Sequence, residues 1–206
     1  PGIDHMSALK MIADSKKEGS EIVGFASLCG GLPAPEAATN RLGYKFSWSP
    51  KGVLTASKNP AQFLVAGQVM KVQPADLLKS SRSLYINPAY HFELLPNRDS
   101  LSYSKLYGIP HVKTMFRGTI RYAGFCKLLG ALADWGFLAE KGPGAAGAKS
   151  AREYTQGICG SENLKNRQDV AELLQEVDLL NEAPLPGAAA SATSPIDVLA
   201  GIDYFF

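Results

Sequence analysis

The chain has 206 residues, of which 46% are hydrophobic and 19% are charged, and it carries a formal net charge of +2 at neutral pH. This composition is ordinary for a globular protein that buries a core, and so weak a charge gives no general reason to expect nucleic acid or a membrane as partner. The sequence also contains no run of about 18 apolar residues, which argues against a membrane-spanning helix.

Cysteine usage indicates a reducing compartment. The three cysteines, Cys29, Cys126 and Cys159, are odd in number and show no Cys-x-x-Cys spacing, which argues against a disulfide framework and a zinc site. The histidines are scattered without helical spacing, so we expect no metal site. We predict an intracellular protein, with the cytoplasm favoured and the mitochondrion as the alternative.

The first part of the chain predicts a mixture of helices and strands. Asp4 is placed to cap a first helix that Gly19 ends, Ser49 to cap a second helix, and Asp99 to cap another. Gly67 can supply the positive φ of a hairpin turn. The predicted helices are 4–19, 51–57, 74–81 and 103–108, and the predicted strands are 21–29, the hairpin 62–72, broken strands in 83–100, and 111–122.

From Gly124 onward the pattern is helical. Residues 124–138 and 166–182 have helical spacing, and Ser194 followed by Pro195 indicates the start of a last helix. The small-residue stretches 142–150 and 184–195 predict linkers.

These patterns predict an α+β fold. We expect a mixed β-sheet domain with flanking helices at residues 1–122 and an all-helical domain at residues 123–206. The chain opens on PGIDHM and closes on aromatic residues, and we expect both domains to be partial pieces of a longer protein.

The stretch CGGLPAPEA at 29–37 predicts a bent, stiff loop at the end of the first strand. Its two glycines permit unusual φ values, whereas Pro33 and Pro35 each hold φ near −65°. Loops at strand ends often carry binding groups, so Cys29 is a candidate for a polar group in a pocket or for a thiolate nucleophile. A buried structural cysteine is the simpler interpretation, and a nucleophile would need a base such as His5 nearby.

Two arginines are candidates for binding an acidic ligand. Arg98 follows Pro96 and Asn97 in a predicted turn, and Arg117 precedes Gly118, which would let a ligand approach the backbone. A guanidinium binds a carboxylate through two parallel hydrogen bonds. The alternative is that Arg98 pairs with Asp99 and that Arg117 is a solvated strand residue.

Five motifs together resemble the saccharopine dehydrogenases of the glutamate-forming type and the corresponding region of the aminoadipate-semialdehyde synthases. The motifs are PGIDHM, SLCGGLPAPEA, LGYKFSWSP, LPNRDS and FRGTIRYAGF. The resemblance runs from residue 1 to about 125 and fades to helical pattern beyond about 137.

The resemblance implies a three-part protein with a Rossmann domain, a mixed domain that binds saccharopine and forms a homodimer, and a helical domain inserted in it. The implied reaction oxidises saccharopine with NADP or NAD and yields glutamate and 2-aminoadipate 6-semialdehyde, or runs in reverse, in lysine metabolism. The cofactor would be bound mainly by the Rossmann domain outside this chain, so we expect the chain alone to be inactive.

The resemblance also implies site residues. Arg98, Arg117, Gly118 and Thr119 would contact the carboxylates of saccharopine, and Cys29 would be a polar group of the catalytic pocket that does not attack. Pro1, Gly2 and Ser49 would border the cofactor. The competing hypothesis is a non-catalytic dimerisation module derived from the same family.

Overall fold

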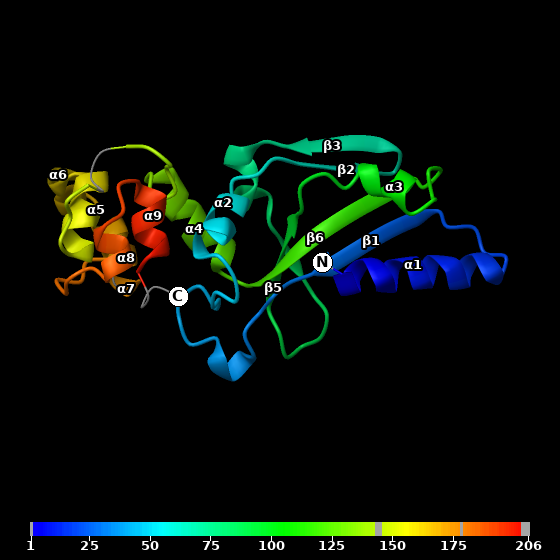
Figure 1. Cartoon of the computed structure of the whole chain (residues 1–206), viewed down its shortest axis with the longest axis horizontal. Helices are drawn as coiled ribbons and strands as arrows, with labels where there is room; N and C mark the ends of the chain where they lie inside the picture. Colours follow the sequence, from blue (N-terminus) through cyan, green and yellow to red (C-terminus); the bar gives the residue numbers. More distant parts are fainter. Residues whose placement is uncertain (1, 143–145, 178, 203–206) are drawn as a thin grey trace. The chain divides into compact units, whose positions relative to one another are not determined.

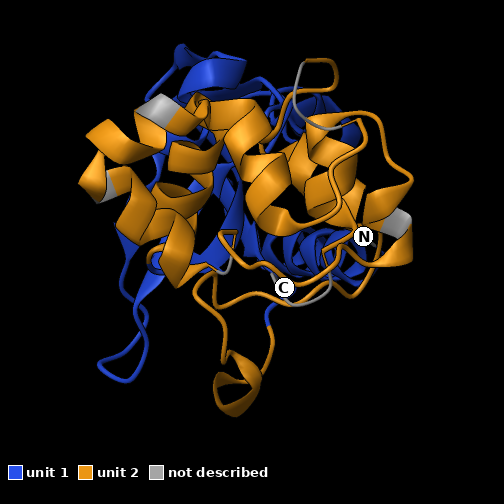
Figure 2. Ribbon diagram, turned by 90° about the vertical axis from the view of Figure 1, so that its left-hand side faces the viewer, with its two compact units in different colours: residues 1–32, 58–123 blue, residues 33–57, 124–206 orange. Residues whose placement is uncertain are grey.

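The chain divides into two units, each assembled from two separate stretches (Figure 2). The computed structural model describes residues 2–142, 146–177 and 179–202. Residues 1–32 and 58–123 form the first unit, and residues 33–57 and 124–206 form the second. The predicted mixed domain contained residues 33–57, which pack instead with the helices of the second unit: Tyr44 is buried there, with its ring 5.7 Å from that of Phe125.

The first unit contains a sheet with helices beside it (Figure 1). Its elements are α1 (Gly2–Lys17), β1 (Gly24–Cys29), β2 (Ala61–Val65), β3 (Gln68–Val72), the 3-10 helices η2 (Pro74–Asp76) and η3 (Leu78–Ser80), β4 (Arg82–Leu84), β5 (Phe92–Pro96), α3 (Ser102–Leu106) and β6 (Thr114–Tyr122).

Strand β6 is the centre of the sheet. The strand order is β3-β2-β6-β5-β4, and β1 pairs with β6 in parallel, whereas the other pairs are antiparallel. Gly118 pairs with Leu28 of β1 and with Pro96 of β5, and Met115 pairs with both β1 and β2. Therefore β1 lies along one edge of β6, while β2 and β5 share the other edge. The predicted α+β class, with its mixed sheet, is confirmed.

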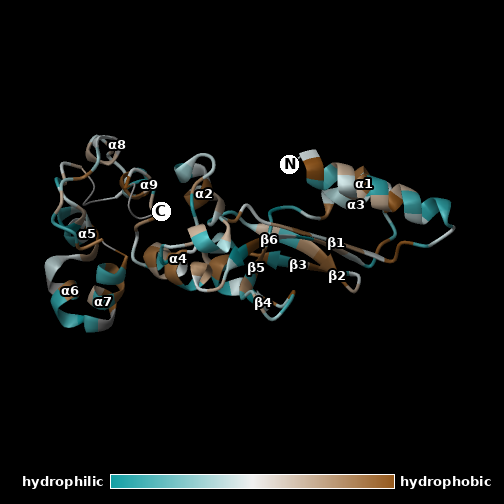
Figure 3. Cartoon of the chain, turned by 90° about the horizontal axis from the view of Figure 1, so that it is seen from below, coloured by the Kyte–Doolittle hydropathy of each residue, from teal (hydrophilic) through white to brown (hydrophobic). Residues whose placement is uncertain are grey.

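Helices α1 and α3 lie together on one face of the sheet (Figure 3). The buried cluster there joins α1, the segment after α3, and Met115 of β6, which is fully buried. The opposite face is apolar as well: Phe63 and Phe116 are in edge-to-face contact at 5.0 Å, while Leu28 and Met70 are 39% and 48% exposed. Helices α1 and α3 thus cover one face of the sheet, whereas the other face keeps exposed apolar side chains. The covered face carries the site described below.

The local predictions of the first unit are largely confirmed. The hairpin turns at Ala66 and Gly67, both with positive φ, and Gly19 has the left-handed conformation that ends α1. Asp4 was predicted as an N-cap, which is wrong, because α1 begins at Gly2 and places Asp4 in the first turn. The single helix predicted at 74–81 is two 3-10 helices.

The second unit is helical. Its elements are η1 (Pro35–Ala37), α2 (Pro50–Ala56), α4 (Phe125–Asp134), α5 (Ala151–Cys159), α6 (Ser161–Asn166), α7 (Gln168–Glu176), α8 (Gly187–Ala190) and α9 (Pro195–Ala200). The α5 and α6 helices had not been predicted, and α8 lies in a predicted linker. Of the described helices in the chain, none is long and apolar enough to cross a bilayer.

Buried side chains at helical spacing hold this unit together. In α4, Phe125, Leu128, Leu129 and Leu132 are all buried, and each such side chain contributes about 1.5–3 kcal/mol through the removal of apolar surface from water. The Tyr154 hydroxyl donates to the carbonyl of Pro195 at 2.7 Å, which satisfies a polar group inside this core.

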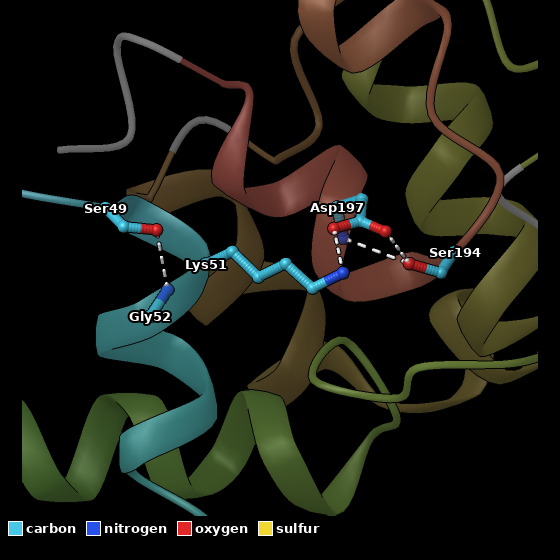
Figure 4. A network of polar contacts seen from close by, with 5 residues as sticks. All are labelled: Ser49, Lys51, Gly52, Ser194 and Asp197. Atoms are coloured by element: carbon cyan, nitrogen blue, oxygen red, sulfur yellow. Dashed lines mark hydrogen bonds and ion pairs between the residues drawn. The ribbon is translucent and has the colours of Figure 1, made fainter.

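A polar network joins the first turn of α2 to the first turn of α9 (Figure 4). Lys51 Nζ lies 2.8 Å from Asp197 Oδ1, and the Ser194 hydroxyl donates to Asp197 Oδ2 at 2.6 Å. Ser49 caps α2 by accepting from Gly52 N at 3.1 Å, as predicted. The hydrogen bond from Lys51, followed by that from Ser194, holds the pKa of Asp197 below its ordinary value of 3.8.

We predict that Lys51→Met lowers the melting temperature at neutral pH, and that the difference from wild type disappears in acid. A carboxyl with a depressed pKa stabilises the fold above the ordinary pKa and loses this contribution as pH falls through the folded value. Thermal unfolding followed by circular dichroism from pH 7 to pH 2 would measure the effect. Lys127→Met, at an exposed site of α4, is the matched control, and equal losses in both variants would contradict the prediction.

Candidate functional site

The pairing of β1 with β6 brings together three of the predicted site residues. Cys29, the last residue of β1, lies directly opposite Thr119 of β6. Arg117 precedes Thr119 by two positions in the same strand and therefore shares its face of the sheet. This is the face that α1 and α3 cover. Residues that are far apart in the sequence thus form one cluster beside the first turn of α1.

The Cys29 thiol is half-buried and held protonated. Burial, followed by the charge and the hydrogen bond of Asp4, raises the pKa of this thiol above its ordinary value of 9.0, while Arg117 acts in the opposite direction. A protonated thiol is a weak nucleophile at neutral pH. His5, considered from the sequence as a base, instead has its Nδ1 2.6 Å from the hydroxyl of Tyr107. The geometry therefore favours a polar, non-attacking thiol.

Arg117 is anchored by its backbone and supported by an aromatic ring. Its N–H donates to the buried hydroxyl of Ser100 at 2.9 Å, and its carbonyl accepts from Asn97 N at 2.9 Å. Its guanidinium carbon lies 4.0 Å from the ring centroid of Tyr103. In the described part of the chain no carboxylate forms an ion pair with Arg117. The backbone bonds and the Tyr103 ring therefore hold Arg117 in place. The alternative interpretation had assumed a solvated strand residue.

Thr119 also has a polar neighbour on the site face. Its hydroxyl oxygen accepts a hydrogen bond from Asn97 Nδ2 at 3.0 Å. Asn97 directly follows β5, the antiparallel neighbour of β6. The hydroxyl still has a proton to donate, so Thr119 can offer a hydrogen bond to an anionic ligand.

Arg98 lies on the turn after β5 and is exposed. Its φ of +47° is unusual for a residue with a side chain. Asp99, the pairing partner suggested from the sequence, accepts from Gln62 and from the backbone of Leu101. Within the described ranges, no ion pair joins Arg98 to Asp99, so the guanidinium is accessible to a ligand.

The hydrogen bonds of Asp99 also control its ionisation. Burial acts to raise the pKa of this carboxyl, but bonds from Ser102, Gln62 and Leu101 outweigh it and hold the pKa below its ordinary value. Asp99 thus anchors the turn that carries Arg98.

The structure gives Gly118 a packing role. An added Cβ would lie 2.5 Å from Leu94 Cδ1, 2.8 Å from Phe116 Cε1 and 3.0 Å from Leu28 Cδ2. These side chains are on the face opposite Arg117. Substrate contact by Gly118 therefore stays a prediction, whereas a larger residue at this position would have to displace the side chains of the apolar face.

The structure says less about the three residues that were expected beside a cofactor. Pro1 lies outside the described residues, Gly2 is exposed at the start of α1, and Ser49 is exposed in the second unit, where it caps α2. Among the described residues, no three His, Cys, Asp or Glu side chains gather as metal ligands.

Sequence reasoning missed the supporting roles of five residues: Asp4, His5, Asn97, Tyr103 and Tyr107. Asp4 was interpreted only as a helix cap, although its charge acts on Cys29 across the fold. The sequence did contain a signal for the two tyrosines. Tyr103 and Tyr107 are four positions apart, which places both rings on one side of a helix, shortly before a strand rich in polar residues.

The cluster offers hydrogen-bond donors rather than a nucleophile and its base. It contains a guanidinium, a hydroxyl, a protonated thiol and an amide, all on strands or on the turn that follows one. Such groups bind and orient an anionic, polar ligand. They do not form the pair of activated groups that covalent catalysis requires.

The comparisons with known proteins agree on one family. The family model described as the saccharopine dehydrogenase C-terminal domain matches residues 1–202. The chain is 48% identical over 140 residues to the saccharopine dehydrogenase [NADP(+), L-glutamate-forming] of Schizosaccharomyces pombe, covering 68% of this chain and 31% of the relative. It is 45% identical over 140 residues to the alpha-aminoadipic semialdehyde synthase of Arabidopsis thaliana, covering 66% of this chain and 13% of the relative.

A solved structure extends the likeness through the helical part. The apo saccharopine dehydrogenase (L-Glu forming) of Saccharomyces cerevisiae superposes with a TM-score of 0.84 at 33% identity, over 97% of this chain and 48% of that one. The expected fading of the resemblance beyond residue 137 is therefore wrong. The chain spans about a third of the length of the fungal curated relative.

We predict that Cys29 reacts slowly with iodoacetamide at neutral pH and that Asp4→Asn accelerates the reaction. Removal of the Asp4 charge lowers the thiol pKa and increases the thiolate fraction, which is the reactive form. Peptide mass spectrometry would measure alkylation of Cys29 separately from the buried Cys126 and Cys159. Asp14→Asn, in the same helix but paired with Lys10, is the control. Alkylation of wild-type Cys29 as fast as a cysteine in a free peptide would refute the assignment.

Proposed function

Because the chain belongs to the saccharopine dehydrogenase C-terminal domain family, we propose that it is the substrate-binding part of an NADP- or NAD-dependent saccharopine dehydrogenase. The whole enzyme would oxidise saccharopine to glutamate and 2-aminoadipate 6-semialdehyde, or catalyse the reverse, in lysine metabolism. We assign the protein to an intracellular compartment, with the cytoplasm favoured over the mitochondrion.

The observation that carries the proposal is the cluster of Arg117, Thr119 and Cys29 on one face of the sheet. Saccharopine has three carboxylates. An arginine on a rigid strand that has no carboxylate partner among the described residues is suited to bind one of them. The accessible Arg98 would bind another. A non-catalytic dimerisation module would not need these three residues on one face. Their cluster therefore favours the enzyme hypothesis over the dimerisation-module hypothesis.

The chain's own residues would act by binding and orientation. Arg117 and Thr119 would hold a carboxylate of saccharopine, which fixes the direction of its secondary amine. The protonated Cys29 thiol would form one polar side of the space around the substrate without attacking it. The nicotinamide cofactor, when bound, supplies hydride transfer.

The dinucleotide is proposed to bind mainly outside this chain. The letters GPGAAG at 142–147 have the spacing of a glycine fingerprint, but they follow α4 rather than a strand, and residues 143–145 lie outside the described residues. The fingerprint works only between a strand and a helix that meets the pyrophosphate. Gly2 and Ser49 are exposed, so each can border a cofactor, but the described residues form no pyrophosphate cradle.

We also propose that the whole protein is a homodimer that uses the uncovered sheet face. Leu28, Phe63, Met70 and Phe116 lie on this face, where the register and the glycine contacts place them together. Apolar patches of this kind mark interaction sites. A second copy would cover the patch with an identical surface, as a two-fold interface does.

We predict that Arg117→Ala in the full-length enzyme weakens saccharopine use by about 2–5 kcal/mol, the scale for loss of one partner of a desolvated charge pair. Arg98→Ala should act in the same direction with a smaller effect, because its side chain is exposed. Cofactor affinity should stay unchanged in both variants. Steady-state kinetics with saccharopine and NADP or NAD would test this, with exposed Arg82→Ala as control. A rise in cofactor KM at unchanged saccharopine KM would place the arginines at the cofactor instead.

We predict that Met70→Asp in the full-length protein weakens the homodimer at least about tenfold, because a charge on an apolar interface is costly to bury. Val69→Asp is the matched control, since Val69 is the next residue of the same strand, is similarly exposed, and points to the other face. Sedimentation velocity over a range of concentrations would measure both. A monomeric wild type, or equal effects of the two variants, would overturn this interface.

A further inference from the structure

An arginine that binds a substrate carboxylate must be held in place without losing its donors. Its long side chain has considerable rotamer freedom, and immobilising it on binding costs affinity. A carboxylate neighbour would restrict the side chain but would occupy the same N–H groups that the ligand needs. An aromatic ring avoids this conflict, because it contacts the flat face of the guanidinium and leaves the N–H groups at its rim free.

Arg117 has such a ring beside it. Its guanidinium carbon is 4.0 Å from the centroid of Tyr103, and over the described ranges no Asp or Glu forms an ion pair with Arg117. We propose that Tyr103 is a positioning residue that holds the Arg117 guanidinium ready for a carboxylate of the substrate. The inference rests on the proposed function, because it assumes that Arg117 binds saccharopine.

The ring of Tyr103 is itself supported. The imidazole of His5 stacks on it with centroids 5.5 Å apart and an interplanar angle of 6°. His5 Nδ1 is in turn 2.6 Å from the hydroxyl of Tyr107, a residue that is 6% exposed and belongs to the buried cluster of the unit. A continuous series of contacts therefore joins the core to Arg117 through Tyr107, His5 and Tyr103.

The three supporting residues come from two separate elements. His5 lies in the first turn of α1, whereas Tyr103 lies in α3 and Tyr107 directly follows it. The rings of Tyr103 and Tyr107 are also neighbours, 5.5 Å apart. The helices that cover the sheet face thus restrict the ring from two sides, which is what a fixed platform requires.

The test uses the full-length enzyme and a double-mutant cycle. Tyr103→Leu removes the ring and Tyr103→Phe retains it, so we expect Tyr103→Leu to raise the saccharopine KM about five- to thirtyfold while kcat changes little. Tyr103→Phe should stay within about twofold of wild type. The matched control is Tyr85→Leu, the same change at a tyrosine that is 75% exposed.

The cycle with Arg117→Ala separates positioning from stability. If Tyr103 acts through Arg117, Tyr103→Leu should have less than about a twofold effect on KM in the Arg117→Ala background. A folding defect would reduce the amount of active enzyme, and so kcat, without changing KM.

Three results would overturn the inference: an unchanged KM for Tyr103→Leu, an equal loss for Tyr103→Phe, or the full loss in the Arg117→Ala background. A wild-type protein that does not oxidise saccharopine would overturn the proposed function and this inference with it. An active wild type with an unaffected Tyr103→Leu would overturn this inference alone.

Discussion

The hydrogen bonding of β6 along both of its edges is the constraint on which the first unit depends. Because β1 occupies one edge and β2 and β5 share the other, the register of β6 cannot shift without breaking bonds on both sides. A shift of one residue would move every side chain to the opposite face. Arg117 and Thr119 would then leave the face covered by α1 and α3, and Gly118 would take their place.

This register separates two tasks on the two faces of a thin sheet. The covered face places polar groups among helices that restrict their movement, whereas the other face presents apolar side chains around Gly118. A larger residue at this position would push against side chains on the apolar face, even though its neighbours in the strand serve the polar site. The proposed substrate site and the proposed dimer interface would therefore use the same strand without competing for surface.

The polar site gains rigidity from the number of elements that contribute to it. Cys29 ends β1, and Arg117 and Thr119 lie within β6. Asn97 begins the turn after β5, where its N–H donates to the carbonyl of Arg117. Side chains on strands and short anchored turns keep their geometry better than side chains on long loops. Asp4 also connects the first turn of α1 to Cys29, so the start of the chain and the end of the first strand are linked at the site.

The sequence by itself determined the class of the fold, most of the elements and the family. Local signals were sufficient for the hairpin at Ala66 and Gly67, the Ser49 and Ser194 caps and the strand through Arg117, because each depends on residues within a few positions of one another. The motifs around Cys29, Arg98 and Arg117 were sufficient for the resemblance, which the family model and the solved structure confirm. Asp4 misled the prediction, because a carboxylate near a helix start is typical of both an N-cap and a first-turn residue.

Only the tertiary structure decided which side chains meet. Cys29 and Thr119 are 90 positions apart in the printed sequence, and their contact follows from the parallel pairing of β1 with β6, which no local pattern specifies. In the same way, His5 meets Tyr107 at a separation of 102 residues, and Tyr103 meets Arg117 because a helix packs over the central strand. Periodicity determines which face a side chain takes within its own element, but packing of one element against another determines what that face touches.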